Sequence, residues 1–157
     1  MEFCIRQAEC NELNVVHETM REAFKEYAGK LQPESGALRE TMEDIERKIS
    51  GGGGAIIAWN NNEPAGSAQY YFKDGYMYIG RVAVIPQYRG SGLGKRLIHY
   101  LEAEARRRSC RETRLEVRLS VPENMKFYER LHYETLEQQY YPGGTDSWYV
   151  MSKDMRA

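Results

Sequence analysis

The chain has 157 residues with 22 Lys and Arg against 23 Asp and Glu, which gives a formal net charge of −1 at pH 7. Its composition, 41% hydrophobic and 29% charged, is typical of a globular protein and excludes a disordered chain. The near-neutral charge argues against nucleic-acid binding, and the absence of any 18-residue apolar run argues against a membrane span. We expect a single domain over residues 1–157.

The first fifty residues predict one strand and two helices. Alternation over residues 3–7 indicates a short strand, and Asn11 is a candidate N-cap for a helix that extends to about residue 27. Leu38, Met42, Ile45 and Ile49 follow at helical spacing and predict a second amphipathic helix. The run Gly51–Gly54 ends that helix, and we interpret it as a flexible connection to the next strand.

The middle of the chain predicts an antiparallel meander. Residues 55–59, 65–72 and 76–84 are rich in apolar, β-branched and aromatic side chains. Asp74-Gly75 is a strong signal for a type I′ hairpin turn between the second and third of these strands.

Further helices and strands follow toward the C-terminus. Residues 93–108 form an amphipathic helix pattern, and residues 113–119 alternate as a strand. A short helix at 124–131 precedes two closing strands at 133–140 and 148–152. This order of elements predicts one mixed α/β domain.

The three cysteines, Cys4, Cys10 and Cys110, are too few and too irregularly spaced for a disulfide framework. No CxxC motif or Cys/His cluster indicates zinc, so no metal is expected. Reduced thiols and an N-terminus without the apolar core of a signal peptide predict a cytoplasmic protein.

Charge is segregated along the chain. Residues 1–50 hold 11 acidic and 7 basic side chains, whereas residues 51–157 hold 12 acidic and 15 basic ones. Two interpretations stay open: ordinary solvated surfaces, or an acidic part that attracts cations beside a basic part that attracts a polyanion.

The most informative segment follows the strand that ends at Val84. Pro86 stops the strand, and glycines at every second position from 90 to 94 occupy the turn that opens the next helix. Such a turn brings backbone N–H groups close to a phosphate, and Lys95 and Arg96 add positive charge. A Walker A loop is excluded because Arg89 lies where its first glycine should be, and the spacing GxGxG does not fit the dinucleotide fingerprint GxGxxG.

Two motifs stand at a characteristic separation. The first is Arg-x-x-Gly-x-Gly, present as Arg89-Gly90-Ser91-Gly92-Leu93-Gly94 after the strand end Val82-Ala83-Val84. The second is Asn124-Met125-Lys126-Phe127-Tyr128-Glu129-Arg130-Leu131-His132-Tyr133, which is similar to an "N…FYxxLGF" helix. Together they resemble the GNAT superfamily of acetyl-CoA-dependent N-acyltransferases. The resemblance implies a mixed, mostly antiparallel twisted sheet of about six or seven strands flanked by about four helices.

The resemblance also assigns roles to individual residues. The backbone of the strand end would pair with the pantetheine arm of acetyl-CoA, and the turn would hold the pyrophosphate. Tyr128 would be catalytic, as the general acid for the departing thiolate. The implied cofactor-binding residues are Val82, Ala83, Val84, Arg89, Gly90, Ser91, Gly92, Leu93, Gly94, Lys95 and Asn124.

Some positions depart from the family pattern. Val121 stands where many members have an asparagine, so Asn124 either contacts the cofactor or caps the short helix. His132 replaces a common glycine and is either a surface residue or a proton relay. The general base is left unnamed, because Glu116, a water chain to Tyr78 and Glu26 remain equal alternatives.

The resemblance implies an N-acetyltransferase that transfers the acetyl group of acetyl-CoA to a primary amine by direct attack in a ternary complex, without a metal or an acyl-cysteine. The alternatives are a non-catalytic CoA-binding regulatory module and a nucleotide-binding switch. We expect residues 11–50 and the C-terminal hairpin, with Tyr140, Tyr141 and Trp148, to select the acceptor. A small-molecule amine is slightly favoured over a peptide N-terminus, and the chain is expected to be a monomer or a homodimer.

Overall fold

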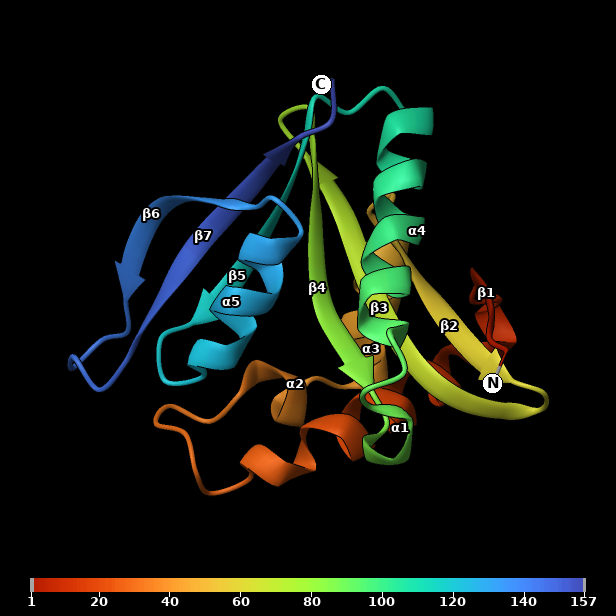
Figure 1. Cartoon of the computed structure of the whole chain (residues 1–157). Coiled ribbons are helices and arrows are strands. Elements are labelled where there is room, and N and C mark those ends of the chain that lie inside the picture. The colour runs from red at the N-terminus through yellow and green to blue at the C-terminus, as the bar shows by residue number, and fades with distance from the viewer. Residues whose placement is uncertain (1, 157) are drawn as a thin grey trace.

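The computed structural model describes residues 2–156, which form a seven-stranded mixed sheet with helices on both faces (Figure 1). The strands are β1 Cys4–Gln7, β2 Gly54–Asn60, β3 Glu63–Lys73, β4 Tyr76–Val84, β5 Glu112–Arg118, β6 Glu134–Tyr140 and β7 Ser147–Asp154. The α-helices are α1 Leu13–Phe24, α2 Gly36–Arg39, α3 Met42–Ser50, α4 Leu93–Arg107 and α5 Pro122–Arg130. Short 3₁₀ turns cover Cys10–Glu12, Lys25–Tyr27 and Pro86–Tyr88.

The sheet order is β1-β2-β3-β4-β5-β7-β6, and every neighbouring pair is antiparallel except β4 with β5. The predicted hairpin between β3 and β4 is confirmed. Lys73 pairs with Tyr76 across a two-residue loop in which Asp74 and Gly75 have φ values of 49° and 84°. Positive φ at both positions is what a type I′ turn requires. The predicted α/β fold with a mixed, mostly antiparallel sheet is therefore confirmed.

Strand β2 is buried on both of its faces, which explains why its sequence is a continuous apolar run. Ile56 and Ala58 pack into the larger core with α4, whereas Ala55 and Ile57 pack on the opposite face with α1 and α3. Successive strand residues point to opposite faces, so a strand covered on both sides has no polar positions to alternate with.

The second predicted helix is divided in the structure. Helices α2 and α3 are separated by Glu40 and Thr41, both in extended conformation. Thr41 accepts a hydrogen bond from the backbone N–H of Asp44, and Asp44 accepts one from the backbone N–H of Thr41, which is a capping box that starts α3. Asn11 is not an N-cap, because it lies inside the 3₁₀ turn that precedes α1.

The run Gly51–Gly54 joins α3 to β2, as expected. Packing also requires glycine at two of its positions. A Cβ on Gly53 would lie 2.3 Å from the carbonyl oxygen of Tyr70, and one on Gly54 would lie 2.5 Å from the hydroxyl of the same tyrosine.

No helix described between residues 2 and 156 combines the length and apolar character needed to cross a membrane.

Candidate functional site

The centre of the sheet opens between β4 and β5. These parallel strands pair only from Tyr76 to Tyr78 on β4 and from Glu112 to Arg114 on β5, after which they diverge (Figure 1). Residues 79–84 of β4 therefore pair with β3 on one edge and with no described strand on the other. A strand edge of this kind can form main-chain hydrogen bonds with an extended ligand.

Next to this opening, β4 contains a bulge at Arg81. Ser67 pairs with Ala83 and Gln69 with Gly80, so two residues of β4 lie opposite one residue of β3. Arg81 has a φ of +52°, a left-handed conformation that costs a residue with a Cβ about 1–2 kcal/mol. The bulge bends the strand where its free edge begins.

The glycine turn lies directly beyond the end of β4. Gly90 and Gly92 have φ values of 81° and 82°, and a Cβ on either would meet no atom within 4 Å, so conformation and not packing requires glycine there. The first main-chain bond of α4 runs from Arg96 N to Gly92 O, which leaves the N–H groups of residues 93–95 without a partner inside the helix. Unpartnered donors of this kind, together with the helix dipole, have the chemistry that suits an anion.

The side chain of Arg89 ties this turn to α1. Its guanidinium pairs with Glu26 at 2.8 Å, donates to the carbonyl oxygen of Ala23 at 2.9 Å and donates to that of Val84 at 3.2 Å. Because Glu26 neutralises this guanidinium, the turn offers an anion mainly backbone N–H groups, with the exposed Lys95 beside them.

Tyr128 lies on α5, one helical turn after Asn124. Its ring packs edge-on against Phe127 and Tyr133, with centroids 5.0 and 5.9 Å away. Burial raises the pKa of Tyr128 well above its ordinary value, so the phenol is protonated at neutral pH. The hydroxyl forms no hydrogen bond with any residue of the described part of the chain.

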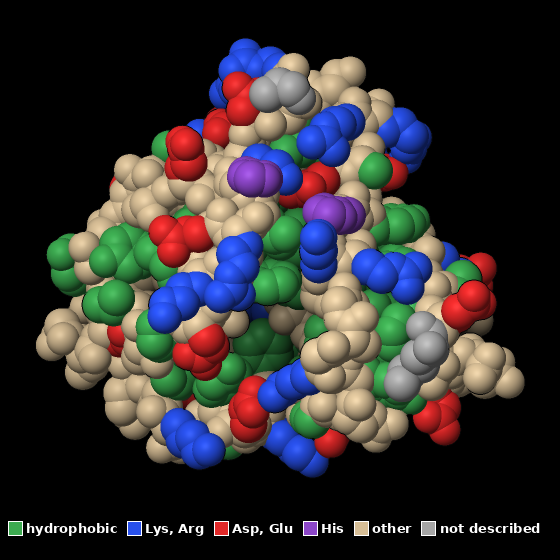
Figure 2. All heavy atoms as spheres, in the orientation of Figure 1, with side chains coloured by type: hydrophobic (Ala, Val, Ile, Leu, Met, Phe, Trp, Pro, Cys, Tyr) green, Lys and Arg blue, Asp and Glu red, His purple; other side chains and the backbone are tan. Residues whose placement is uncertain are grey.

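Two adjoining cavities meet at Tyr128. One, of about 530 Å³, extends along Val82–Val84 to Arg89 and Gly94. The other, of about 280 Å³, extends between β4 and β5 toward α2. The residues that line both are Phe24, Tyr27, Val82, Asn124 and Tyr128. Figure 2 shows a hollow below α5 that is lined by hydrophobic side chains and rimmed by charges of both signs.

We refer to the smaller of these as the acceptor cavity. Among the described residues, Glu116 on β5 is the one carboxylate that lines it. The hydroxyl of Tyr78 on β4 donates a hydrogen bond of 2.7 Å to Glu116 Oε1. Burial, and secondarily the charge of Glu116, raises the pKa of Tyr78 well above its ordinary value, so Tyr78 also remains protonated. Glu26, an alternative carboxylate, is paired with Arg89 in the neighbouring cavity.

The structure brings most of the expected site residues into one cleft and corrects others. Asn124 is not a cap, because α5 starts two residues earlier and Val121 occupies the N-cap position. His132 lies in a separate surface hollow with Arg106 and Glu134, away from Tyr128. Tyr140 is 67% exposed and does not line the acceptor cavity.

Some residues that line the acceptor cavity were predicted from the sequence, and others were not. Tyr141 and Trp148 line it, as the C-terminal hairpin predicted. Phe24 and Tyr27 belong to residues 11–50, which were expected to contribute to this cavity. Arg81 reaches it from the bulge in β4, for which the sequence holds no signal. None of the acidic side chains of residues 11–50 lines this cavity.

Comparisons with known proteins agree with this geometry. A family model described as the acetyltransferase (GNAT) family matches residues 15–133. Among solved structures, the chain is similar in fold to PaiA N-acetyltransferase from Thermoplasma acidophilum in complex with coenzyme A, with a TM-score of 0.81, 21% identity, and coverage of 98% of this chain and 99% of that one. It is also similar to the ribosomal-protein-S18-alanine N-acetyltransferase from Escherichia coli, with a TM-score of 0.80, 18% identity, and coverage of 98% and 94%. No curated protein sequence matches the chain significantly.

Proposed function

The chain belongs to the acetyltransferase (GNAT) family, and on this premise we propose that it transfers an acetyl group from acetyl-CoA to a primary amine within one ternary complex. One observation carries the proposal: the free edge of β4 runs from the anion-binding turn at the start of α4 to Tyr128, and the acceptor cavity opens at that point. An extended ligand with a phosphate at one end fits this path. The similar protein from T. acidophilum binds coenzyme A, which supports the same assignment here.

The residues present fit acetyl-CoA, which supplies an activated thioester. Those main-chain N–H and C=O groups of Val82, Ala83 and Val84 that face the free edge of β4 would hold the pantetheine arm as a neighbouring strand holds its partner. The unpaired N–H groups of residues 90–95 would hold the pyrophosphate, and Lys95 would add charge. A Cβ on Gly94 would make only an ordinary contact with the ring of Phe127, at 3.4 Å, so packing inside the protein does not require glycine there.

Glu116 is our candidate for the general base. An amine must lose a proton before it can attack a carbonyl, and Glu116 is the carboxylate that the acceptor cavity offers. The hydrogen bond from Tyr78 fixes one of its oxygens and leaves the other for the acceptor. A backbone N–H near Val84 would polarise the thioester carbonyl.

Tyr128 is our candidate for the general acid. Its raised pKa keeps the proton on the phenol, and its hydroxyl has no competing partner among the described residues. A thiolate with a pKa near 8.5 leaves more readily when a hydroxyl donates to it.

The acceptor cavity favours a small amine. Its volume of about 280 Å³ is just below the range of about 300–1,000 Å³ found for small-molecule pockets.

Thiol release from acetyl-CoA over a panel of amines tests the proposal. Tyr128→Phe and Glu116→Gln should each lower kcat by about 10²- to 10⁴-fold, the usual contribution of a general acid or base. The matched controls are Tyr100→Phe on α4 and Glu112→Gln on β5, which make the same chemical changes outside both cavities and should leave kcat unchanged. Binding of CoA without turnover of any amine would instead favour a non-catalytic CoA-binding module.

A further inference from the structure

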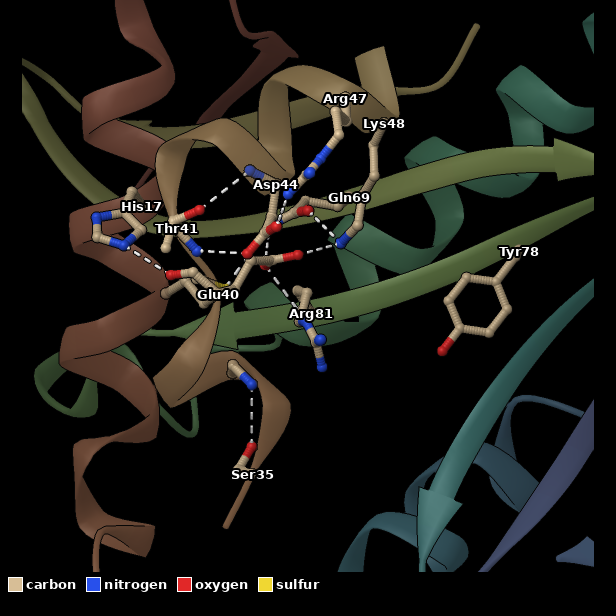
Figure 3. Close-up of polar contacts among 12 residues, drawn as sticks. His17, Ser35, Glu40, Thr41, Asp44, Arg47, Lys48, Gln69, Tyr78 and Arg81 are labelled. Atoms are coloured by element: carbon tan, nitrogen blue, oxygen red, sulfur yellow. Dashed lines mark hydrogen bonds and ion pairs between the residues drawn. The ribbon is translucent and has the colours of Figure 1, made fainter. Parts of the chain in front are cut away.

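A buried carboxylate lies behind the acceptor cavity. Glu40, between α2 and α3, is 6% exposed and receives hydrogen bonds from Lys48, from Gln69 Nε2 at 3.1 Å and from Arg81 Nε at 3.3 Å (Figure 3). One carboxylate is therefore shared by two cations, and this group of side chains carries one net positive charge.

Arg81 is the residue of this group whose positive charge faces the acceptor cavity. Its Nε is used by Glu40, whereas Nη1 and Nη2 form no hydrogen bond with any residue between 2 and 156. In Figure 3 these two nitrogens point away from Glu40, toward the side on which Ser35 lies. Arg81, Ser35 and Gly36 all line the acceptor cavity.

Gly36 leaves room for this guanidinium. A Cβ on Gly36 would lie 2.8 Å from Arg81 Nη2, closer than real Cβ contacts, and 3.1 Å from Nη1, so the end of the Arg81 side chain would have to shift. The backbone of α2 therefore lies directly against the guanidinium, and the bulge in β4 fixes the same residue from the other end.

The second cation of the cavity is differently placed. Arg118 is bound through Nε to Asp146 and through Nη2 to the carbonyl oxygen of Pro33, and its side chain is 11% exposed against 34% for Arg81. Its charge is matched by that of Asp146. Arg81 is thus the cation of this wall whose donors are available to a ligand.

The acceptor cavity consequently offers two opposite charges. Glu116 and Tyr78 lie where β4 and β5 diverge, and Arg81 lies on the α2 side. A planar guanidinium with two unused nitrogens has the geometry to bind a carboxylate with two parallel hydrogen bonds. A polycationic amine, by contrast, would bring positive charge against Arg81.

We propose that the acceptor carries a carboxylate besides its amine, as a free amino acid does, and that Arg81 binds this carboxylate while Glu116 faces the amine. This inference rests on the proposed transfer of an acetyl group to an amine. It makes Arg81 the residue that determines specificity within the acceptor cavity.

The test compares free L-amino acids with their carboxamides, which keep the amine and the side chain but lack the negative charge. Wild type should show a higher kcat/KM for the acids. Arg81→Met should lower kcat/KM for the acids by about 10- to 100-fold, the range for loss of a charge-assisted hydrogen bond, and change the amides little. Arg39→Met is the matched control, because Arg39 is exposed beside Glu40 but does not line the acceptor cavity.

A second variant tests the proposal even if Arg81→Met fails to fold. Gly36→Ala keeps the charge but forces the guanidinium to move, so it should also reduce the preference for acids over amides. If Arg81 only supported the bulge, both classes of acceptor would lose kcat equally, and the proposal would be overturned.

Binding measured by calorimetry, with CoA present, separates this inference from the proposed function. Acids that bind to wild type but not to Arg81→Met, without any turnover, would refute acetyl transfer and retain the carboxylate site. Turnover of amines with no preference for acids would retain acetyl transfer and refute the carboxylate site.

Discussion

Replacing Tyr133 with Phe should destabilise the fold and spare the chemistry. The Tyr133 hydroxyl bonds to Thr113 Oγ1 and to Glu102 Oε2, each at 2.8 Å, and links α4 to β5. Tyr133 and Thr113 are 3% and 0% exposed, and Glu102 is 2% exposed. The phenyl ring of the variant would still pack against Tyr128 and leave the position of that residue unchanged.

The magnitude follows from the two hydrogen bonds that are lost. A buried bond between neutral groups contributes about 1 kcal/mol, and one to a charged group about 1.5–3 kcal/mol. Glu102 keeps Lys153, whose Nζ lies 3.1 Å from Oε2, so its charge is not left without a partner. We therefore expect a loss of roughly 2–4 kcal/mol in the free energy of unfolding, or roughly 5–15 °C in Tm for a chain of this length.

Urea and thermal unfolding of the two proteins measure this loss, and thiol release measures activity below the transition. Tyr100→Phe is the control, because its hydroxyl has no hydrogen bond with any described residue, and it should change stability by less than about 0.5 kcal/mol. An unchanged Tm for Tyr133→Phe would refute the energetic reasoning. A loss of kcat in the folded variant would show that Tyr133 takes part in the reaction.

Three further predictions concern the turn, acid stability and alkaline pH. Gly92→Ala should weaken CoA binding by more than about tenfold, measured by calorimetry. The control Gly52→Ala has a similar positive φ and equally open surroundings. It should lower the free energy of unfolding by about 1 kcal/mol and leave CoA binding unchanged. Burial opposes ionisation of Asp146, but its hydrogen bonds prevail and lower its pKa. Asp146→Asn should therefore lower the free energy of unfolding above about pH 4, and this loss should shrink as the pH falls further. Equal losses at pH 7 and pH 3, measured by urea unfolding, would contradict this. Burial raises the pKa of Tyr128, so kcat should not fall up to about pH 10, the ordinary value for tyrosine, and an earlier alkaline loss in the pH profile would count against its role as acid.

The periodic elements were predictable because local pattern and burial agree in them. The strand at 76–84 and the hairpin turn at Asp74-Gly75 are found as predicted, since both depend on short-range geometry. The break between α2 and α3 was missed because apolar spacing continues across it, although Thr41 and Asp44 already held a capping signal. Asn11 failed as a cap because Glu9 and Glu12 cap the preceding 3₁₀ turn instead.

The site was predictable only where its signal is local. Glycine spacing located the turn, because the conformation required there depends on adjacent residues. The pairing of Glu116 with Tyr78 depends on how far two parallel strands stay together before they diverge, and the direction of Arg81 depends on a bulge. Both are properties of the assembled sheet, so no pattern along the chain indicates them.

The residues that line the acceptor cavity come from widely separated parts of the chain. Tyr27 and Gly36 come from its first quarter and Tyr141 and Trp148 from its last residues, whereas the turn and the free strand edge come from residues 79–95. Tyr27 lines both cavities, whereas Gly36, Tyr141 and Trp148 line only the acceptor cavity of the two, so substitutions at these three positions leave the lining of the larger cavity unchanged. Under the proposed function, these three positions are where engineering can change the acceptor while the binding path for acetyl-CoA is kept.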